Sequence, residues 1–270
     1  MSEAIARNST VYGPVRSWRL GMSLGIDLLY VDSICSFDCV YCQLGRINRL
    51  TTKREIFVPT EKVIADLKKA GLPDVDAVTF SGNGEPTLAL NLGVVIKAVK
   101  ALVDAPIVVL TNSSLLGDPA VRRDLMAADK VFCKLDAVSN DALRRIDRPA
   151  VNMDIDEIAV NIRRFREEFK GEIALQTMLL SMPAESEIAR YAKLVRDIMP
   201  DELQLNAPTR PVPVDWDIEN RGNHEARLVG YRQLKHPGPV EMLLVAGRIE
   251  TATGIRVLTP PAKKEKAVDA

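Results

Sequence analysis

The sequence predicts an α/β fold whose strands form a partial (β/α)6 barrel, a TIM-like barrel that lacks two of its eight units. Six short apolar segments have the length and composition of buried strands, and each of them except the last is followed by a helical pattern. Such alternation requires parallel strands with right-handed crossovers. A chain of 270 residues fits one domain of this kind with a modest extension.

The expected elements alternate regularly along the chain. The strands are Leu24–Leu29, Ala77–Ser81, Ile107–Thr111, Val131–Leu135, Ile173–Leu179 and Glu202–Asn206. The helical patterns cover residues 60–70, 90–103, 119–128, 152–170 and 185–199. The first helix is expected to begin with Thr60 as its N-cap and to end at Gly71, a residue type that often closes helices.

The two ends of the chain have weaker patterns. Residues 1–20 mix turn, apolar and basic residues and are expected to form an ordered cap before the barrel, which covers residues 21–212. Residues 213–270 are expected to form a short irregular C-terminal extension, whose charged tail from Pro260 to Lys266 is disordered.

The composition is that of a globular protein, with 47% hydrophobic and 27% charged residues. Basic and acidic residues both number 36, so the zero net charge gives no reason to expect tight nucleic-acid binding over the whole surface. The N-terminus lacks the apolar segment of a secretory signal, and no apolar run approaches the roughly 18 residues that span a bilayer. We therefore expect a cytoplasmic protein with no membrane partner, in a reducing, low-oxygen compartment.

Three of the four cysteines, Cys35, Cys39 and Cys42, form a CxxxCxxC block after the first expected strand. Three thiolates on one short loop suit a soft metal centre. A zinc site would require a fourth protein ligand, and three cysteines cannot all be paired in disulfides. A cubane [4Fe–4S] cluster usually takes four thiolates, so three leave one iron open to a small ligand. Cys133, inside an apolar strand, is expected to be a small buried hydrophobe rather than a fourth ligand.

This block resembles the CxxxCxΦC loop of the radical S-adenosylmethionine (radical SAM) superfamily, with Tyr41 as the aromatic residue Φ. The resemblance implies a partial barrel and a [4Fe–4S] cluster whose open iron is chelated by S-adenosylmethionine. It implies reductive cleavage of S-adenosylmethionine to methionine and a 5′-deoxyadenosyl radical, which abstracts hydrogen from a substrate. It also implies an electron donor such as flavodoxin or ferredoxin.

Polar residues follow the next expected strands, at the end where a barrel binds its ligands. The loop Gly82-Asn83-Gly84-Glu85 resembles the GGEP-like motif with which radical SAM proteins hold the amino group of S-adenosylmethionine. Asn112 is expected either to bind ribose or substrate or to cap a helix. Lys134 and Asp136 alternate onto one side of a strand and are expected to contact the cofactor or each other. The expected cofactor contacts are thus Tyr41, Gly82, Asn83, Gly84, Glu85, Asn112, Lys134 and Asp136.

Longer stretches resemble a narrower group, the radical SAM proteins related to the wyosine-synthase type of tRNA-modifying enzyme. These stretches are GPVRSWRLGMSLGID before the cysteines, CVYCQLG across them and LRRIDRP at residues 143–149. The chain lacks the extra cysteines that give wyosine synthases a second cluster, so the likeness is to single-cluster proteins. It implies RNA or a nucleotide as the substrate. Arg16 and Arg19 in the first stretch are expected either to meet an anion or to be surface charges.

Amide and basic side chains near the later strands are candidates for substrate binding. Gln176 is expected to line the cavity, and Asn206 and Arg210 lie in or next to a proline-stiffened loop. Arg210 is the first choice for binding an anion, followed by the arginines between residues 144 and 148. The alternative for all these arginines is an exposed surface position.

Two other functions stay open from the sequence. The small size and the single cluster also suit an activase that generates a glycyl radical on a partner protein, and the substrate would then be a protein. The alternative from another class is a non-catalytic iron–sulfur or zinc protein. About four irons and four sulfides per chain would exclude zinc.

Overall fold

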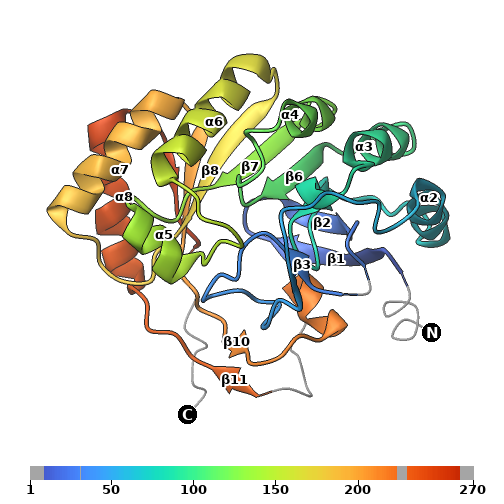
Figure 1. Cartoon of the computed structure of the whole chain (residues 1–270), viewed down its shortest axis with the longest axis horizontal. Helices are drawn as coiled ribbons and strands as arrows, with labels where there is room; N and C mark the ends of the chain where they lie inside the picture. Colours follow the sequence, from blue (N-terminus) through green and yellow to red (C-terminus); the bar gives the residue numbers. More distant parts are fainter. Residues whose placement is uncertain (1–8, 31, 224–229, 262–270) are drawn as a thin grey trace, which may run out of the picture.

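The computed structural model describes residues 9–30, 32–223 and 230–261 (Figure 1). Within these residues, one curved sheet contains eight strands. In spatial order they are β1 (Val11–Ser17), β2 (Gly21–Ile26), β5 (Ala77–Phe80), β6 (Ile107–Thr111), β7 (Lys130–Lys134), β8 (Glu172–Met178), β9 (Glu202–Asn206) and β12 (Val257–Leu258). Only β1 and β2 pair in antiparallel fashion, and all the other neighbours are parallel. The predicted α/β fold with a partial barrel is confirmed.

Helices cover the convex face of this sheet and form an arc in Figure 1. They are α2 (Thr60–Lys69), α3 (Leu92–Lys100), α4 (Pro119–Leu125), α6 (Ile155–Glu168), α7 (Glu185–Ile198) and α8 (Pro239–Thr253), and the short α5 (Asn140–Ile146) lies near the strand ends. In α6, four buried residues recur every three or four positions, at Ile155, Ile158, Ile162 and Phe165. This spacing places one apolar stripe against the sheet.

The main hydrophobic core lies between the sheet and the helices. Alternate residues of β6 divide between the two faces of the sheet: Ile107 and Val109 join this core, whereas Val108 faces the other way. On the concave face, Val108 belongs to a small apolar cluster with Ala77, Phe132 and Ala174. The floor of the half-barrel is therefore filled, and its open end lies at the carboxyl ends of the strands.

The N-terminal segment differs from the expected cap, because residues 11–17 form the edge strand β1. Its partner β2 begins at Gly21 and ends at Ile26, three residues earlier than the expected first strand. The end of β2 has a local cause: the Asp27 carboxylate accepts a hydrogen bond from Leu29 N at 2.9 Å. Such a side-chain bond two residues ahead stabilises a turn in place of a strand.

The C-terminal part is more regular than the irregular extension expected from the sequence. It contains the two short antiparallel strands β10 (Val212–Pro213) and β11 (Tyr231–Arg232), the 3-10 segment η2 (Ile218–Asn223), the helix α8 and the strand β12. Because α8 exposes Val240, Leu243 and Leu244 in addition to its buried face, its sequence lacks a clear amphipathic period. Of the expected disordered tail, Ala262 to Lys266 lie outside the described residues. No helix in the described ranges is both long and apolar enough to cross a membrane.

Candidate cofactor site at the strand ends

The cysteine loop follows β2 and crosses the carboxyl end of the sheet. It begins with β3 (Ile34–Cys35), which pairs with β4 (Arg49–Leu50). Its middle is tied to the end of α5 by backbone hydrogen bonds from Asp38 N to Asp147 O at 3.0 Å and from Val40 N to Ile146 O at 2.9 Å. These bonds hold the three cysteines against the barrel, where each residue as a whole is half-buried and its thiol is the enclosed part.

Each thiol lies in a buried, acidic environment. Burial raises the pKa of all three thiols, to about 11 for Cys42, and the Asp147 carboxylate adds to the rise at Cys39, whose Sγ lies 3.6 Å from Asp147 Oδ1. Cys35 Sγ receives hydrogen bonds from Phe37 N at 3.4 Å and from Asn112 Nδ2 at 3.6 Å. A metal centre bound here would supply the positive charge that stabilises thiolates.

The chemistry of the donor set fits an iron–sulfur cluster. The three thiols are soft ligands, and together they can bind three of the four irons of a [4Fe–4S] cluster.

The loop from Gly82 to Glu85 lies directly against the start of the cysteine loop. Ile34 N donates to Asn83 O at 2.8 Å, and Glu85 N donates to Ile34 O at 3.1 Å. Gly84 has a φ of +148°, and a Cβ atom at this position would lie 1.6 Å from Ile34 O. Glycine is required here because both the backbone conformation and the close approach exclude a side chain.

We expect Gly84→Ala to separate the two loops. The overlap with the Ile34 carbonyl must be relieved by movement of backbone, so unfolding free energy should fall by about 1–3 kcal/mol and iron loading should fall with it. Gly247→Ala is the matched control, because a Cβ atom there meets nothing within 4 Å inside α8. Thermal unfolding and iron content of the two variants measure the effect. Equal behaviour of both variants would contradict the proposed contact between the loops.

The Glu85 carboxylate is buried and is occupied by donors from its own chain. It accepts hydrogen bonds from Thr87 N at 3.0 Å, Thr111 Oγ1 at 2.7 Å and Asn112 N at 2.6 Å. These bonds fix the ends of β5 and β6 relative to each other. They also place the Asn112 side chain, whose Nδ2 donates to Ser36 Oγ at 2.8 Å. The structure thus gives Glu85 a positioning role, and a direct contact with S-adenosylmethionine stays a prediction.

A second polar network adjoins the last part of the cysteine loop. Lys134 Nζ lies 3.1 Å from Asp136 Oδ2, so the two residues contact each other, which is one of the two expected arrangements, and a contact with the cofactor stays a prediction. The Tyr41 hydroxyl donates to the same Asp136 carboxylate and lies 3.4 Å from Asp147 Oδ1. Burial and the Asp136 charge raise the pKa of both Tyr41 and Asp147. The sequence did not single out Asp147, which lies in a stretch dominated by arginines.

Asp27 and Trp216, which no motif in the sequence indicated, hold the Asn83 side chain. Its Nδ2 donates to Asp27 Oδ2 at 2.6 Å, and its Oδ1 accepts from Trp216 Nε1 at 3.1 Å. Asp27 is also paired with Arg221, whose Nη1 lies 3.1 Å from Asp27 Oδ2. Asp27 and Arg221 are almost fully buried. Trp216 and Arg221 of the C-terminal segment therefore help to hold the Gly82–Glu85 loop in place, Trp216 directly and Arg221 through Asp27.

The candidate substrate residues come together on β8, β9 and the loop that follows. Gln176 Nε2 donates to Gln204 Oε1 at 2.8 Å, and Asn206 Oδ1 accepts from Arg19 Nη1 at 3.2 Å. Arg210 lies four residues after Asn206, in the loop that follows β9. The other arginines do not join this group: Arg144 and Arg145 pair with Asp141 on the exposed side of α5, and Arg148 lies 3.9 Å from Asp38.

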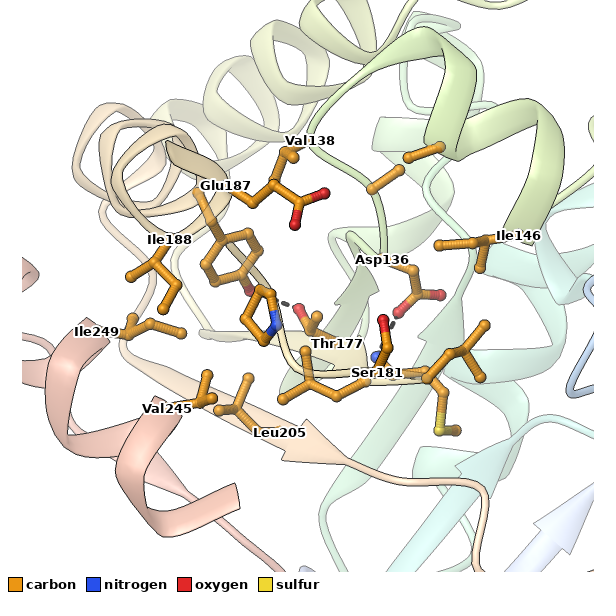
Figure 2. Close-up of a pocket in the computed structure, with 17 residues that line it drawn as sticks. Asp136, Val138, Ile146, Thr177, Ser181, Glu187, Ile188, Leu205, Val245 and Ile249 are labelled. Atoms are coloured by element: carbon orange, nitrogen blue, oxygen red, sulfur yellow. Dashed lines mark hydrogen bonds between the residues drawn. The ribbon is translucent and has the colours of Figure 1, made fainter. Parts of the chain in front are cut away.

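A cavity of about 100 Å³ lies beside this site, between the ends of β8 and β9 and the helices α5, α7 and α8 (Figure 2). Its wall is mainly apolar and includes Ile188, Leu205 and Val245. Asp136 lies at its edge in Figure 2, where Asp136 Oδ1 accepts a hydrogen bond from Met178 N at 2.6 Å. Asp136 is therefore shared between this cavity and the network around Tyr41.

Comparison with known proteins agrees with this geometry. The sequence profile of the Radical SAM superfamily matches residues 30–195, more than half of the chain. A UPF0026 protein of Synechocystis sp. is 44% identical over 256 residues, which cover 94% of this chain and 97% of that protein. The chain belongs to the radical SAM superfamily and to the UPF0026 proteins. Membership implies an enzyme, with a [4Fe–4S] cluster and S-adenosylmethionine as its cofactors.

One further relative and one solved structure are also similar to this radical SAM chain. A UPF0026 protein of Methanocaldococcus jannaschii is 37% identical over 206 residues, covering 74% of this chain and 64% of that protein. A radical SAM methyltransferase from Sphaerobacter thermophilus has the same fold, with a TM-score of 0.53 at 16% identity over 88% of this chain and 65% of that one. The chain thus spans about two thirds of each. None of these three proteins carries a wyosine-synthase name, so that part of the resemblance stays a prediction.

Proposed function

We propose that this protein is a radical SAM enzyme that binds one [4Fe–4S] cluster through Cys35, Cys39 and Cys42 and reductively cleaves S-adenosylmethionine. The observation that carries the proposal is the packing of the three-cysteine loop against the Gly82–Glu85 loop at the open end of a half-barrel. When bound, the two cofactors supply a 5′-deoxyadenosyl radical that abstracts hydrogen from a substrate.

The residues around the cysteines have defined tasks in this proposal. Asn112 orients Cys35, and Glu85 holds Asn112. Gly82 and Gly84 pack closely against Asp27 and Ile34, which the lack of side chains permits, and we assign their backbone carbonyl groups to the amino group of S-adenosylmethionine. Lys134 and Asp136 form a charge pair beside Tyr41, which keeps the Lys134 ammonium 4.9 Å from the centre of the Tyr41 ring. These groups preorganise the site before the cofactors enter.

For the substrate, we propose RNA or a nucleotide. The support is the likeness of GPVRSWRLGMSLGID to the tRNA-modifying group, together with the amide and arginine side chains that gather on β9. A partner protein that receives a glycyl radical is the second candidate, and the single three-cysteine motif is the feature that favours it. The physiological electron donor is proposed to be a flavodoxin or a ferredoxin.

The test is an anaerobic assay of 5′-deoxyadenosine. Protein reconstituted with iron and sulfide is mixed with S-adenosylmethionine and dithionite, with and without bulk RNA. Formation of 5′-deoxyadenosine is the expected result, and stimulation by RNA would support the RNA substrate. Formation without stimulation would shift the proposal to nucleotides or a partner protein. Absence of 5′-deoxyadenosine from a correctly loaded cluster would overturn the enzymatic proposal.

A further inference from the structure

Two arginines from distant parts of the chain lie near each other beside the end of β9. Arg19 lies in the turn between β1 and β2, and Arg210 lies in the loop after β9. Arg19 Nη1 donates to Asn206 Oδ1 at 3.2 Å and thereby reaches across to the end of β9. The Arg19 guanidinium also stacks 5.2 Å from the Trp18 ring centre, which restricts its orientation.

Among the described residues, no carboxylate lies at ion-pair distance from Arg19 or Arg210. Arg19 Nε is a buried donor without an acceptor in the same part of the chain. Burial and the nearby Arg210 charge lower the pKa of Arg19 to about 10. Glu202 opposes this shift from a distance, and its carboxylate accepts a hydrogen bond from Gln204 Nε2 at 2.5 Å. A pKa of about 10 keeps the Arg19 guanidinium charged at neutral pH.

We propose that Arg19 and Arg210 together bind an oxyanion of the substrate, either a phosphate or a carboxylate group. The proposal rests on the function proposed above and defines the chemical class of its substrate. A guanidinium group presents several N–H donors in a planar fork that matches phosphate and carboxylate oxygens. Since the Arg19 Nε donor has no acceptor within the described chain, an anion at this position would satisfy it.

The amides next to the arginines extend this site along the barrel wall. Asn206 uses its oxygen to accept from Arg19, and no hydrogen bond from its NH2 group is found among the described residues. Gln176 and Gln204 form a hydrogen bond with each other, and Gln204 lies two residues before Asn206 on β9. Such groups suit the polar, uncharged part of a substrate that is anchored by its anion.

Calorimetric titration of the anaerobically reconstituted full chain tests the proposal. The probes are inorganic phosphate, pyrophosphate and succinate, and the phosphate and carboxylate arms distinguish the two sources of the oxyanion. Arg19→Gln and Arg210→Gln should each weaken binding of the preferred probe by roughly tenfold or more, the loss of about one charge-assisted hydrogen bond. Arg164→Gln is the matched control, because Arg164 is exposed on α6 and its substitution should leave the affinity unchanged.

Equal affinities for the parent chain and both variants would overturn the proposal, as would absence of binding by all three probes. If Arg19→Gln does not fold, the exposed Arg210→Gln still provides the measurement. Anion binding is measured without cleavage of S-adenosylmethionine. A parent chain that binds phosphate but forms no 5′-deoxyadenosine would therefore refute the proposed reaction and leave the proposed anion site standing.

Discussion

Replacing any one of Cys35, Cys39 and Cys42 with alanine is expected to reduce 5′-deoxyadenosine formation to the background of the assay. Three thiolates already leave one iron without a protein ligand, so the loss of another leaves two irons uncoordinated and the cluster is not retained. The measurements are iron content after reconstitution and 5′-deoxyadenosine per chain after reduction with dithionite.

Cys133→Ala provides a control with the same chemical change at a different place. Cys133 is fully buried in the main core of the protein, as the sequence predicted, and its substitution should cost about 1 kcal/mol of stability through a small cavity. We expect this variant to bind iron and to cleave S-adenosylmethionine like the parent. A Cys39→Ala variant that retains full cleavage, or a folded Cys133→Ala variant that loses it, would contradict the assignment of the ligands.

Asp27→Asn is expected to produce the largest loss of stability outside the cysteine loop. The change removes the Asp27 charge from its pair with the buried Arg221 guanidinium, and loss of one partner from a buried ion pair costs about 3–5 kcal/mol. For a chain of this size, a loss of that order lowers Tm by about 6–20 °C. Because Asp27 also holds Asn83, the Gly82–Glu85 loop should lose order and iron loading should fall in parallel.

Asp197→Asn is the matched control for this prediction. It makes the same substitution in an exposed pair, with Lys193 Nζ 2.7 Å from Asp197 Oδ2, and should change stability by less than about 1 kcal/mol. The double variant Asp27→Asn with Arg221→Met removes both charges and should recover part of the loss. The measurement is thermal unfolding of the parent, the two single variants and the double variant. An Asp27→Asn variant as stable as Asp197→Asn would show that the buried pair does not support the loop.

The sequence predicted those parts of the fold that depend on local patterns. The six parallel strands are short runs with continuous burial, such as Ala77–Phe80, and the intervening helices have regular apolar stripes. The strand β1 was missed because Gly13 and Pro14 interrupt its pattern. The helix α8 was missed because it is apolar on its exposed side as well as its buried side.

The residues of the candidate site could likewise be predicted only where they belong to a local motif. The three cysteines and the Gly82–Glu85 loop have compact motifs, and the sequence placed them in neighbouring βα units. The supports around them depend on contacts between distant residues: Asp27 is 56 positions from Asn83 and 194 from Arg221. A single buried aspartate after a strand gives no indication of its partners. Glu85 shows the related problem that a motif identifies a residue but not whether its carboxylate faces a ligand or the protein.

Metal analysis combined with electron paramagnetic resonance tests the central claim most directly. The anaerobically reconstituted chain should contain about four irons and four sulfides. After reduction with dithionite, its spectrum should change when S-adenosylmethionine is added, because the cofactor binds the iron that the three cysteines leave open. A chain that binds zinc in place of iron, or a reduced cluster whose spectrum is the same with and without S-adenosylmethionine, would contradict the account.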